Sequence, residues 1–162
     1  MDYSGDKKVK VSQIKYLSGI LDEFSEDLGK SVSNPAAEHL FQVRDESEAK
    51  FLPEEKAREF HHVTAQLLFL ANRARLDIQT VVAFLTTKVK RPNEDDWGKL
   101  RRVLKYLKGT KYMKLTLTID DLSIIKWWVD ASDWMHHNLR GHTGSMMSLG
   151  GARWLVVCVN KN

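Results

Sequence analysis

Residues 92–110 read PNEDDWGKLRRVLKYLKGT, a pattern typical of an amphipathic helix. Pro92 and the acidic residues after it favour a helix start, because proline fits the first turn and acids complement the positive end of the helix dipole. Large apolar side chains then recur at spacings of three and four: Trp97, Leu100, Val103, Leu104 and Leu107. Gly109 is predicted to end the helix in the left-handed conformation. The stretch therefore predicts one helix with a buried stripe.

The positions outside this stripe are strongly basic. They are Lys99, Arg101, Arg102, Lys105 and Lys108, and the series continues with Lys111 and Lys114. Residues 88–114 carry ten basic and three acidic groups, whereas residues 1–60 carry nine basic and thirteen acidic groups. Such a local surplus favours a polyanionic partner, most simply the backbone of a nucleic acid. The alternative is a solvated helix face, since basic groups near a helix C-terminus also suit its dipole.

Two further helices of the same core are predicted upstream. Pro53 and the glutamates after it begin the first, and Asp77 begins the second. Their apolar positions are Phe60, Val63, Leu67, Leu68, Leu70, Ala71, Ile78, Val81, Val82, Phe84 and Leu85. A helix is also predicted over residues 12–24, after a strand that ends near Val11. The acidic segment 25–52 is expected to be the least ordered part of the chain.

Downstream of residue 110 the hydrophobic period changes to that of β-strands. Residues 112–119 alternate between apolar and polar side chains, Asp120-Asp121 favours a turn, and residues 122–129 form an apolar run that ends at Asp130. Two more strands are predicted around a turn at Gly150-Gly151, which gives a meander of three or four strands. The predicted fold class is α+β, with a small bundle of three to four helices followed by an incomplete antiparallel sheet. The expected domains are residues 1–52, 53–111 and 112–162.

Composition excludes several classes of protein. The 162-residue chain has no stretch near the roughly 20 apolar residues that a membrane span requires, and no apolar core of a secretory signal follows its charged N-terminus. Its single cysteine, Cys158, excludes a disulfide scaffold and a cysteine-based zinc site. We therefore expect a cytoplasmic or nuclear protein with no membrane partner. The sequence carries no phosphate-binding loop, dinucleotide fingerprint or nucleophile elbow.

Asp130 is the candidate for metal chemistry. A carboxylate at the end of an apolar strand is costly unless it is solvated, paired or bound to a metal. Enzymes that cut nucleic acids place acids at such positions to hold magnesium beside a phosphate. The alternative is an edge aspartate that caps the next turn with help from Ser132. The histidines that follow, His136, His137 and His142, match no recognised zinc spacing.

Several stretches of the chain match the pattern of one known family. They are Val11 to Leu17, Phe60-His61-His62, Gln66 to Leu70, Asp77 to Thr80, Pro92 to Trp97 and Arg102 to Thr110, followed by Lys126 to Ser132 and Arg140 to Gly144. On these residues the chain resembles copia-type retrotransposon polyproteins, at the end of the reverse transcriptase and the start of the ribonuclease H domain. The resemblance covers roughly residues 9–151, and the run from 97 to 110 is its most specific part.

The resemblance implies a role for each part of the chain. The helices at 53–109 would correspond to the thumb and connection that grip the template–primer, in line with the basic series described above. The nucleic-acid contacts would then come from Lys99, Arg101, Arg102, Lys105, Lys108 and Lys111. Asp130 would be the first of the four acidic residues with which ribonuclease H holds two magnesium ions. The incomplete sheet would be the beginning of a ribonuclease H-like fold.

The chain also departs from the family pattern. The paired aspartates of the polymerase are expected before Met1, and residues 150–162 replace the lysine-rich strand and acidic helix that the family places next. This change suggests a shifted reading frame in a decayed element. Because two-metal hydrolysis needs several carboxylates, Asp130 alone would be a vestigial site that binds magnesium weakly. No cofactor is expected in this fragment, although the parent family uses Mg²⁺.

The leading hypothesis is a catalytically silent remnant of a reverse transcriptase–ribonuclease H polyprotein with residual affinity for the backbone of an RNA–DNA hybrid or duplex. One alternative is a stand-alone module that binds nucleic acid through its basic helix. Another is one half of a ribonuclease H that a partner chain completes in trans. The unfinished sheet would support such an association, because its apolar faces need cover.

Overall fold

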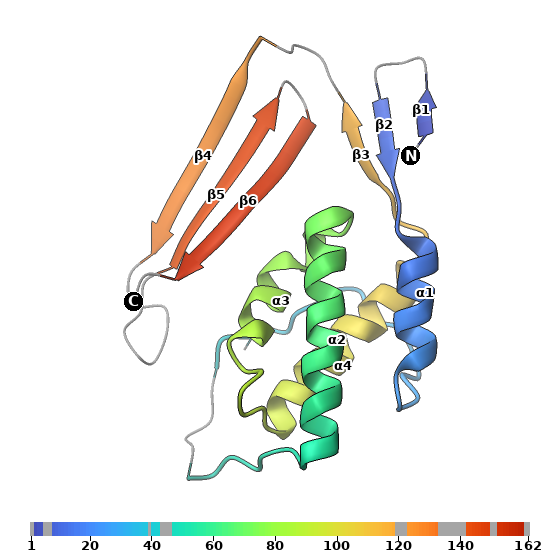
Figure 1. Cartoon of the computed structure of the whole chain (residues 1–162), viewed down its shortest axis with the longest axis vertical. Coiled ribbons are helices and arrows are strands. Elements are labelled where there is room, and N and C mark those ends of the chain that lie inside the picture. Colours follow the sequence, from blue (N-terminus) through green and yellow to red (C-terminus); the bar gives the residue numbers. More distant parts are fainter. Residues whose placement is uncertain are drawn as a thin grey trace. The chain divides into compact units, whose positions relative to one another are not determined.

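The computed structural model describes residues 2–4, 8–38, 40–42, 47–118, 123–132, 142–149 and 152–160. The chain divides into two compact units (Figure 1). The helical unit is Gln13–Met113, and the strand unit combines Met1–Ser12 with Lys114–Asn162. This division differs from the expected domains 1–52, 53–111 and 112–162. The reason is that the N-terminal strand pairs with a strand that follows the helices, while the first helix joins the helical core.

The helical unit contains α1 (Ile14–Glu23), α2 (Glu54–Arg73), the short 3₁₀ helix η1 (Leu76–Ile78), α3 (Gln79–Thr86) and α4 (Glu94–Gly109). Pro53 is the N-cap of α2, and acidic residues fill the first turn, as predicted. Asn93 caps α4 through a capping box, in which its side chain accepts from the backbone of Asp96 and the Asp96 carboxylate accepts from the backbone of Asn93. None of the described helices has the length and apolar character needed to cross a membrane.

The predicted apolar stripes form the core of the helical unit. All five stripe positions of α4 are buried, from Trp97 to Leu107, and Leu17 and Ile20 of α1 pack in the same cluster. The stripes of α2 and α3 are also buried, except that Leu68 of α2 is 38% exposed. The spacing of apolar residues therefore correctly predicted these helices and nearly all of their inward positions.

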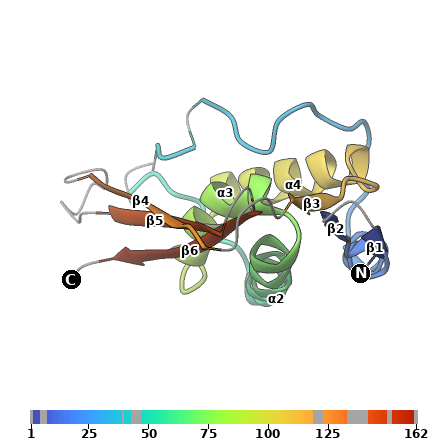
Figure 2. The same ribbon diagram turned by 90° about the horizontal axis from the view of Figure 1, so that it is seen from above.

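The segment after α1 belongs to this core, although the sequence suggested little order there. Leu28 and Leu40 are buried, and the ring of Phe24 stacks on that of Trp97 with 5.4 Å between centroids. Figure 2 shows this blue segment passing over α4 and α3 on the side away from α2. The expectation of a loosely ordered segment is therefore wrong for residues 25–38 and 40–42, because Leu28 and Leu40 are buried against the helices.

Gly109 serves a different purpose from the predicted left-handed stop. It is the last residue of α4, and the helix is capped by Thr110 at φ −115°. A Cβ atom at Gly109 would lie 2.8 Å from the Cβ of Ser31, which is closer than side-chain carbons approach. The glycine therefore lets the segment after α1 pass directly over the end of α4.

The strand unit contains two antiparallel sheets among its described residues. The first has the order β1 (Asp2–Ser4), β2 (Lys8–Val11) and β3 (Leu115–Thr118). The predicted strand 112–119 is thus shorter, and its partner is β2 rather than the next strand along the chain. Val9 lies opposite Leu117 and Val11 opposite Leu115, so the apolar positions of the two strands coincide. Asp120-Asp121, the predicted turn, lies outside the described residues.

The second sheet is a meander of β4 (Ile125–Ser132), β5 (His142–Leu149) and β6 (Ala152–Asn160). Leu149 pairs with Ala152 across a two-residue connection, although Gly150-Gly151 itself lies outside the described residues. Large apolar side chains of β4 are open to solvent, with Trp127 56% and Val129 69% exposed. These exposures agree with the sequence-based view that the sheet needs cover.

A buried arginine joins the end of α4 to the turn between α2 and α3. Arg75 is only 3% exposed, and its Nε and Nη2 atoms donate to Asp77 at 2.9 and 2.7 Å. Its guanidinium also donates to the carbonyl and hydroxyl oxygens of Thr110 at 3.1 and 2.6 Å. The Tyr106 hydroxyl donates to Asp77 at 2.7 Å and completes the network. Every partner of the guanidinium therefore comes from one of two short segments, Asp77 in η1 or the end of α4.

We predict that Asp77→Asn destabilises the helical unit by about 3 kcal/mol, because it leaves the buried Arg75 charge without its counter-charge. Burial by itself raises the pKa of Asp77, but hydrogen bonds from Arg75 and Tyr106 and the charge of Arg75 outweigh it, so the pKa lies below 3.8. The ionised carboxylate thus stabilises the fold above the unfolded-state pKa, and this contribution is lost as the pH falls through the lowered folded-state pKa.

Urea unfolding at a series of pH values measures both effects. The wild type should lose stability below about pH 4 more steeply than Asp77→Asn, because only the wild type has this carboxylate to protonate. Asp22→Asn, at an exposed position of α1, is the matched control and should change the unfolding free energy by less than about 0.5 kcal/mol. Equal stability of Asp77→Asn and the control would contradict a central role for the network.

Candidate nucleic-acid interface

The basic residues predicted to contact nucleic acid lie on α4 and just beyond it. Lys99, Arg101, Arg102 and Lys105 are half-buried, and Lys108 is exposed in the last turn. Lys111 follows in the turn after Thr110 and is also half-buried. Acidic residues occupy the first turn of α4 and basic ones the rest, which suits the helix dipole along its whole length. Lys99, Arg101, Arg102, Lys105 and Lys108 therefore lie on one helix and Lys111 lies just after it, but most of these side chains are less exposed than expected.

The segment after α1 crosses this basic surface and supplies oxygen atoms to it. Lys99 Nζ donates to the carbonyl oxygen of Gln42 at 2.8 Å. Arg102 donates to the side-chain oxygen of Asn34, and Lys108 Nζ donates to the carbonyl oxygen of Gly29 at 3.2 Å. All three acceptors are uncharged. These cations are therefore hydrogen-bonded by the chain, while their charge is not neutralised by these contacts.

Arg101 differs, because it meets a carboxylate of the same segment. Its Nε atom lies 2.9 Å from Glu26 Oε2, and a terminal nitrogen donates to the carbonyl oxygen of Asp27 at 3.3 Å. The other oxygen of Glu26 accepts from Lys56 Nζ at 2.7 Å and from the indole of Trp97 at 3.1 Å. Hydrogen bonding by Lys56 lowers the pKa of Glu26 against the opposing effect of burial, and Trp97 and Arg101 add to the lowering. Glu26 thereby ties the segment after α1 to α2 and α4.

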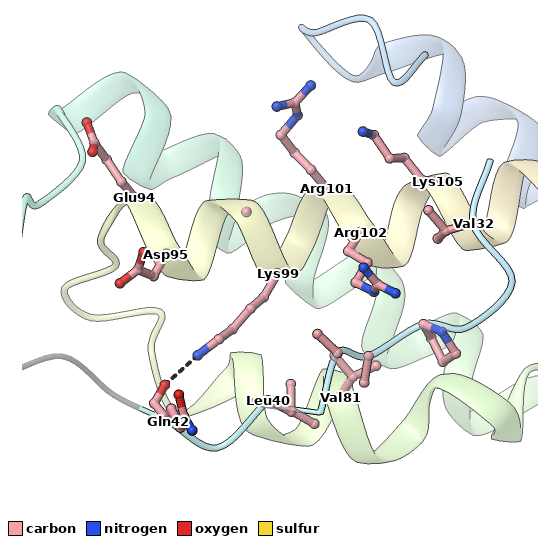
Figure 3. A pocket seen from close by; sticks show the side chains of 14 residues that line it. Val32, Leu40, Gln42, Val81, Glu94, Asp95, Lys99, Arg101, Arg102 and Lys105 are labelled. Atoms are coloured by element: carbon pink, nitrogen blue, oxygen red, sulfur yellow. Dashed lines mark hydrogen bonds between the residues drawn. The ribbon is translucent and has the colours of Figure 1, made fainter. Parts of the chain in front are cut away.

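A cavity of about 580 Å³ lies between α4 and the segment that crosses it. Figure 3 shows Lys99 and Arg102 extending from α4 on the side of Leu40 and Val81, while Arg101 and Lys105 leave the helix in a different direction. Gly98 forms part of its wall, and a Cβ there would have open space around it. Desolvation lowers the pKa of Lys99, although Asp96 raises it in part. Two carboxylates, Glu94 and Asp95, also line the cavity, but its four lysine and arginine side chains outnumber them, so the lining suits a ligand that carries negative charge.

The predicted metal residue is far less enclosed. Asp130 lies in β4 opposite Gly144 of β5 and is exposed. Across the part of the chain that the structure describes, no group of three or more histidine, cysteine, aspartate or glutamate side chains gathers as a metal site would require. The segment with Asp133, His136 and His137 lies outside the described residues. Asp130 belongs to the strand unit, and the basic residues of α4 belong to the helical unit.

Sequence reasoning missed the residues that face the basic helix. Glu26, Asn34 and the carbonyl groups of Gly29 and Gln42 come from the acidic segment that was expected to be the least ordered part of the chain. One signal was available: residues 1–60 carry a surplus of acidic groups, while residues 88–114 carry a surplus of basic ones. Opposite charges in two parts of one chain favour contact between them.

We predict that Glu26→Gln lowers the free energy of unfolding by about 1–2 kcal/mol, because hydrogen bonds to a charged group are stronger than neutral ones. Glu26 contributes above its unfolded-state pKa, and its contribution is lost as the pH falls through the lowered folded-state pKa. Thermal melts at neutral pH measure the loss. Glu48→Gln, an exposed position, removes the same charge and should leave the melting temperature nearly unchanged. Equal effects of both variants would show that Glu26 gives no specific stabilisation.

Comparison with known proteins shows similarity to transposon proteins. The chain is 28% identical over 111 residues to the retrovirus-related Pol polyprotein from transposon TNT 1-94 of Nicotiana tabacum, which covers 64% of this chain and 8% of that protein. It is 32% identical over 90 residues to a putative transposon Ty5-1 protein of Saccharomyces cerevisiae, which covers 56% of this chain and 29% of that protein. The chain thus spans less than a third of either relative.

No protein-family model matches the chain, and no solved structure matches it. The two sequence similarities extend over more than half of the chain in each case. The chain is similar to transposon-derived proteins, and this similarity supports its origin as a fragment of a retrotransposon polyprotein.

Proposed function

We propose that this chain binds the phosphate backbone of a nucleic acid through the basic surface of α4, as a remnant of a copia-type reverse transcriptase–ribonuclease H polyprotein. The ligand class is an RNA–DNA hybrid or duplex of the kind that a template–primer presents. The residues assigned to binding are Lys99, Arg101, Arg102, Lys105, Lys108 and Lys111. The strand unit would represent the start of a ribonuclease H-like fold.

The observation that carries the proposal is the kind of partner these cations have. Lys99, Arg102 and Lys108 donate to uncharged oxygen atoms, so these contacts leave their positive charges on α4 without neutralisation. Phosphate oxygens bear formal charge, and hydrogen bonds between ionised groups are about twice as strong as neutral ones. Exchange of an amide or carbonyl oxygen for a phosphate oxygen is therefore favourable at each of these positions.

The proposal assigns binding and no cleavage. Hydrolysis by two metal ions needs several carboxylates that hold the ions about 4 Å apart. Asp130, the residue that the family resemblance assigns to such a site, supplies one carboxylate at an exposed position of β4. A vestigial Asp130 would bind Mg²⁺ weakly, and backbone binding by α4 does not require the ion.

We predict that purified protein binds an RNA–DNA hybrid with an affinity that falls roughly 40-fold between about 50 and 200 mM salt, as expected for about three phosphate contacts. Fluorescence anisotropy with a labelled hybrid measures both the affinity and its logarithmic salt slope. Absence of binding at the lowest salt concentration would contradict the proposed function.

The paired variant Arg102→Gln with Lys105→Gln tests the assignment to α4. It should weaken binding and reduce the magnitude of the salt slope by about 2, because two phosphate contacts are lost. Lys15→Gln with Arg73→Gln removes two exposed charges outside α4 and serves as the matched control. Circular dichroism should show the same helix content for both. An unchanged slope in the α4 variant would place the binding surface elsewhere on the chain.

A further inference from the structure

Residues 29–38, here called the lid, cover the basic surface and are held at both ends. Leu28 and Leu40 flank the lid and are 5% and 6% exposed, so each end is fixed in the helical core. Gly29 begins the lid with φ +60°, a left-handed conformation that glycine adopts without strain. Between these two points the side chains of the lid are half-buried or exposed. The lid is therefore a short bridge between two fixed anchors.

A cavity separates part of the lid from α4, while Val32 and Ala36 of the lid pack against the helical core. Val32, Pro35 and Ala36 form the lid side of the 580 Å³ cavity, and Arg102 and Lys105 form part of the helix side (Figure 3). Close-packed interiors leave few voids larger than a water molecule. Because the cavity already separates part of the lid from α4, opening mainly costs the packing of Val32 and Ala36 against the core.

Polar contacts of the lid occupy the same cations that the proposed function requires. Asn34 accepts from Arg102, and the carbonyl oxygen of Gly29 accepts from Lys108. The Nε atom of Arg102 is buried, and it has no hydrogen-bond partner among the described residues. The lid thus satisfies these cations only in part and offers them no negative charge. A phosphodiester would supply both the missing charge and further acceptor oxygens.

We propose that residues 29–38 regulate the basic surface: the closed lid holds Arg102 and Lys108, and it opens between Leu28 and Leu40 to admit the phosphate backbone of a nucleic acid. This inference rests on the proposed function. In free protein only molecules with an open lid can bind, so the apparent affinity is the intrinsic affinity multiplied by the open fraction. Conditions that favour opening therefore strengthen binding. The burial that lowers the pKa of Lys99 is in keeping with a cationic site closed without an anion in place.

The close approach of Ser31 to Gly109 offers a way to hold the lid shut. A Cβ at Gly109 would lie 2.8 Å from Ser31 Cβ, about 1 Å less than in a typical disulfide, so a small shift allows a bridge. We would combine Ser31→Cys and Gly109→Cys in a Cys158→Ser background, which removes the natural thiol. Loss of both thiols on oxidation, measured by mass spectrometry, verifies that the bridge has formed.

Oxidised and reduced forms of this variant are then compared for binding of the RNA–DNA hybrid at one salt concentration. The bridge should weaken binding at least roughly tenfold, and reduction should restore it, because only the reduced lid can open. Ser31→Cys alone in the same background controls for the oxidant. Equal affinity of the oxidised and reduced forms would overturn the lid while leaving the proposed function intact. Absence of binding by the wild type would overturn both.

A second pair of variants tests the lid without a disulfide. Gly109→Ala places its methyl group against Ser31 and should displace the lid, so that hybrid affinity rises roughly threefold. Ser31→Gly combined with Gly109→Ala removes the opposing carbon and should return the affinity to that of the wild type. This double variant also corrects for any effect of alanine on α4 itself. Unchanged or weaker binding by Gly109→Ala would contradict an opening lid.

Discussion

The guanidinium of Arg75 sits almost wholly inside the helical unit, and the placement of α4 depends on how that charge is satisfied. A buried cation is tolerated only with a counter-charge and hydrogen bonds, which here come from Asp77 and from Thr110 at the end of α4. Tyr106 adds a further bond to Asp77 and so holds α4 from a second position. Because these hydrogen bonds are directional, they fix how the last turns of α4 are rotated about the helix axis and how deeply these turns pack into the helical unit. That rotation decides which cations face the segment that crosses the helix.

The same charges stabilise the fold and provide the proposed binding surface. Glu26 gathers Lys56, Trp97 and Arg101, while uncharged oxygens of the lid take up Arg102 and Lys108. The two kinds of contact differ in strength, because a carboxylate neutralises a cation and a carbonyl group does not. Arg101 is therefore a structural residue as much as a binding one. Arg102 and Lys108 are the positions where a phosphate gains most over the existing partner.

Local pattern predicted the helices well, because each one shows its buried side within a few turns of sequence. The stripe from Trp97 to Leu107 and the start of α2 after Pro53 are found as expected. Features that depend on distant residues were not predicted. Gly109 looked like a helix stop, since nothing local shows that Ser31 would approach it, and β3 was expected to pair with the strand after it.

The candidate site was predicted in part for the same reason. Sequence placed the cations together on one helix, but long basic side chains reach partners that lie far away along the chain. Asn34 and Gln42 are separated from their cations by more than fifty residues, and no periodicity links them. The descent from a retrotransposon polyprotein rests on sequence similarity, and the use of the basic surface rests on the physical argument about its partners.

The pairing of β2 with β3 has a consequence for the order of folding. Val11 lies opposite Leu115, so the whole helical unit is inserted between two neighbouring strands. An unfolded loop of that length makes the strand pairing entropically costly and slow, whereas helices with short connections assemble from contacts close in sequence. The helical unit must therefore form first, and by bringing its two ends together it makes the first sheet possible. During synthesis β2 cannot complete its pairing with β3 until Thr118 has emerged.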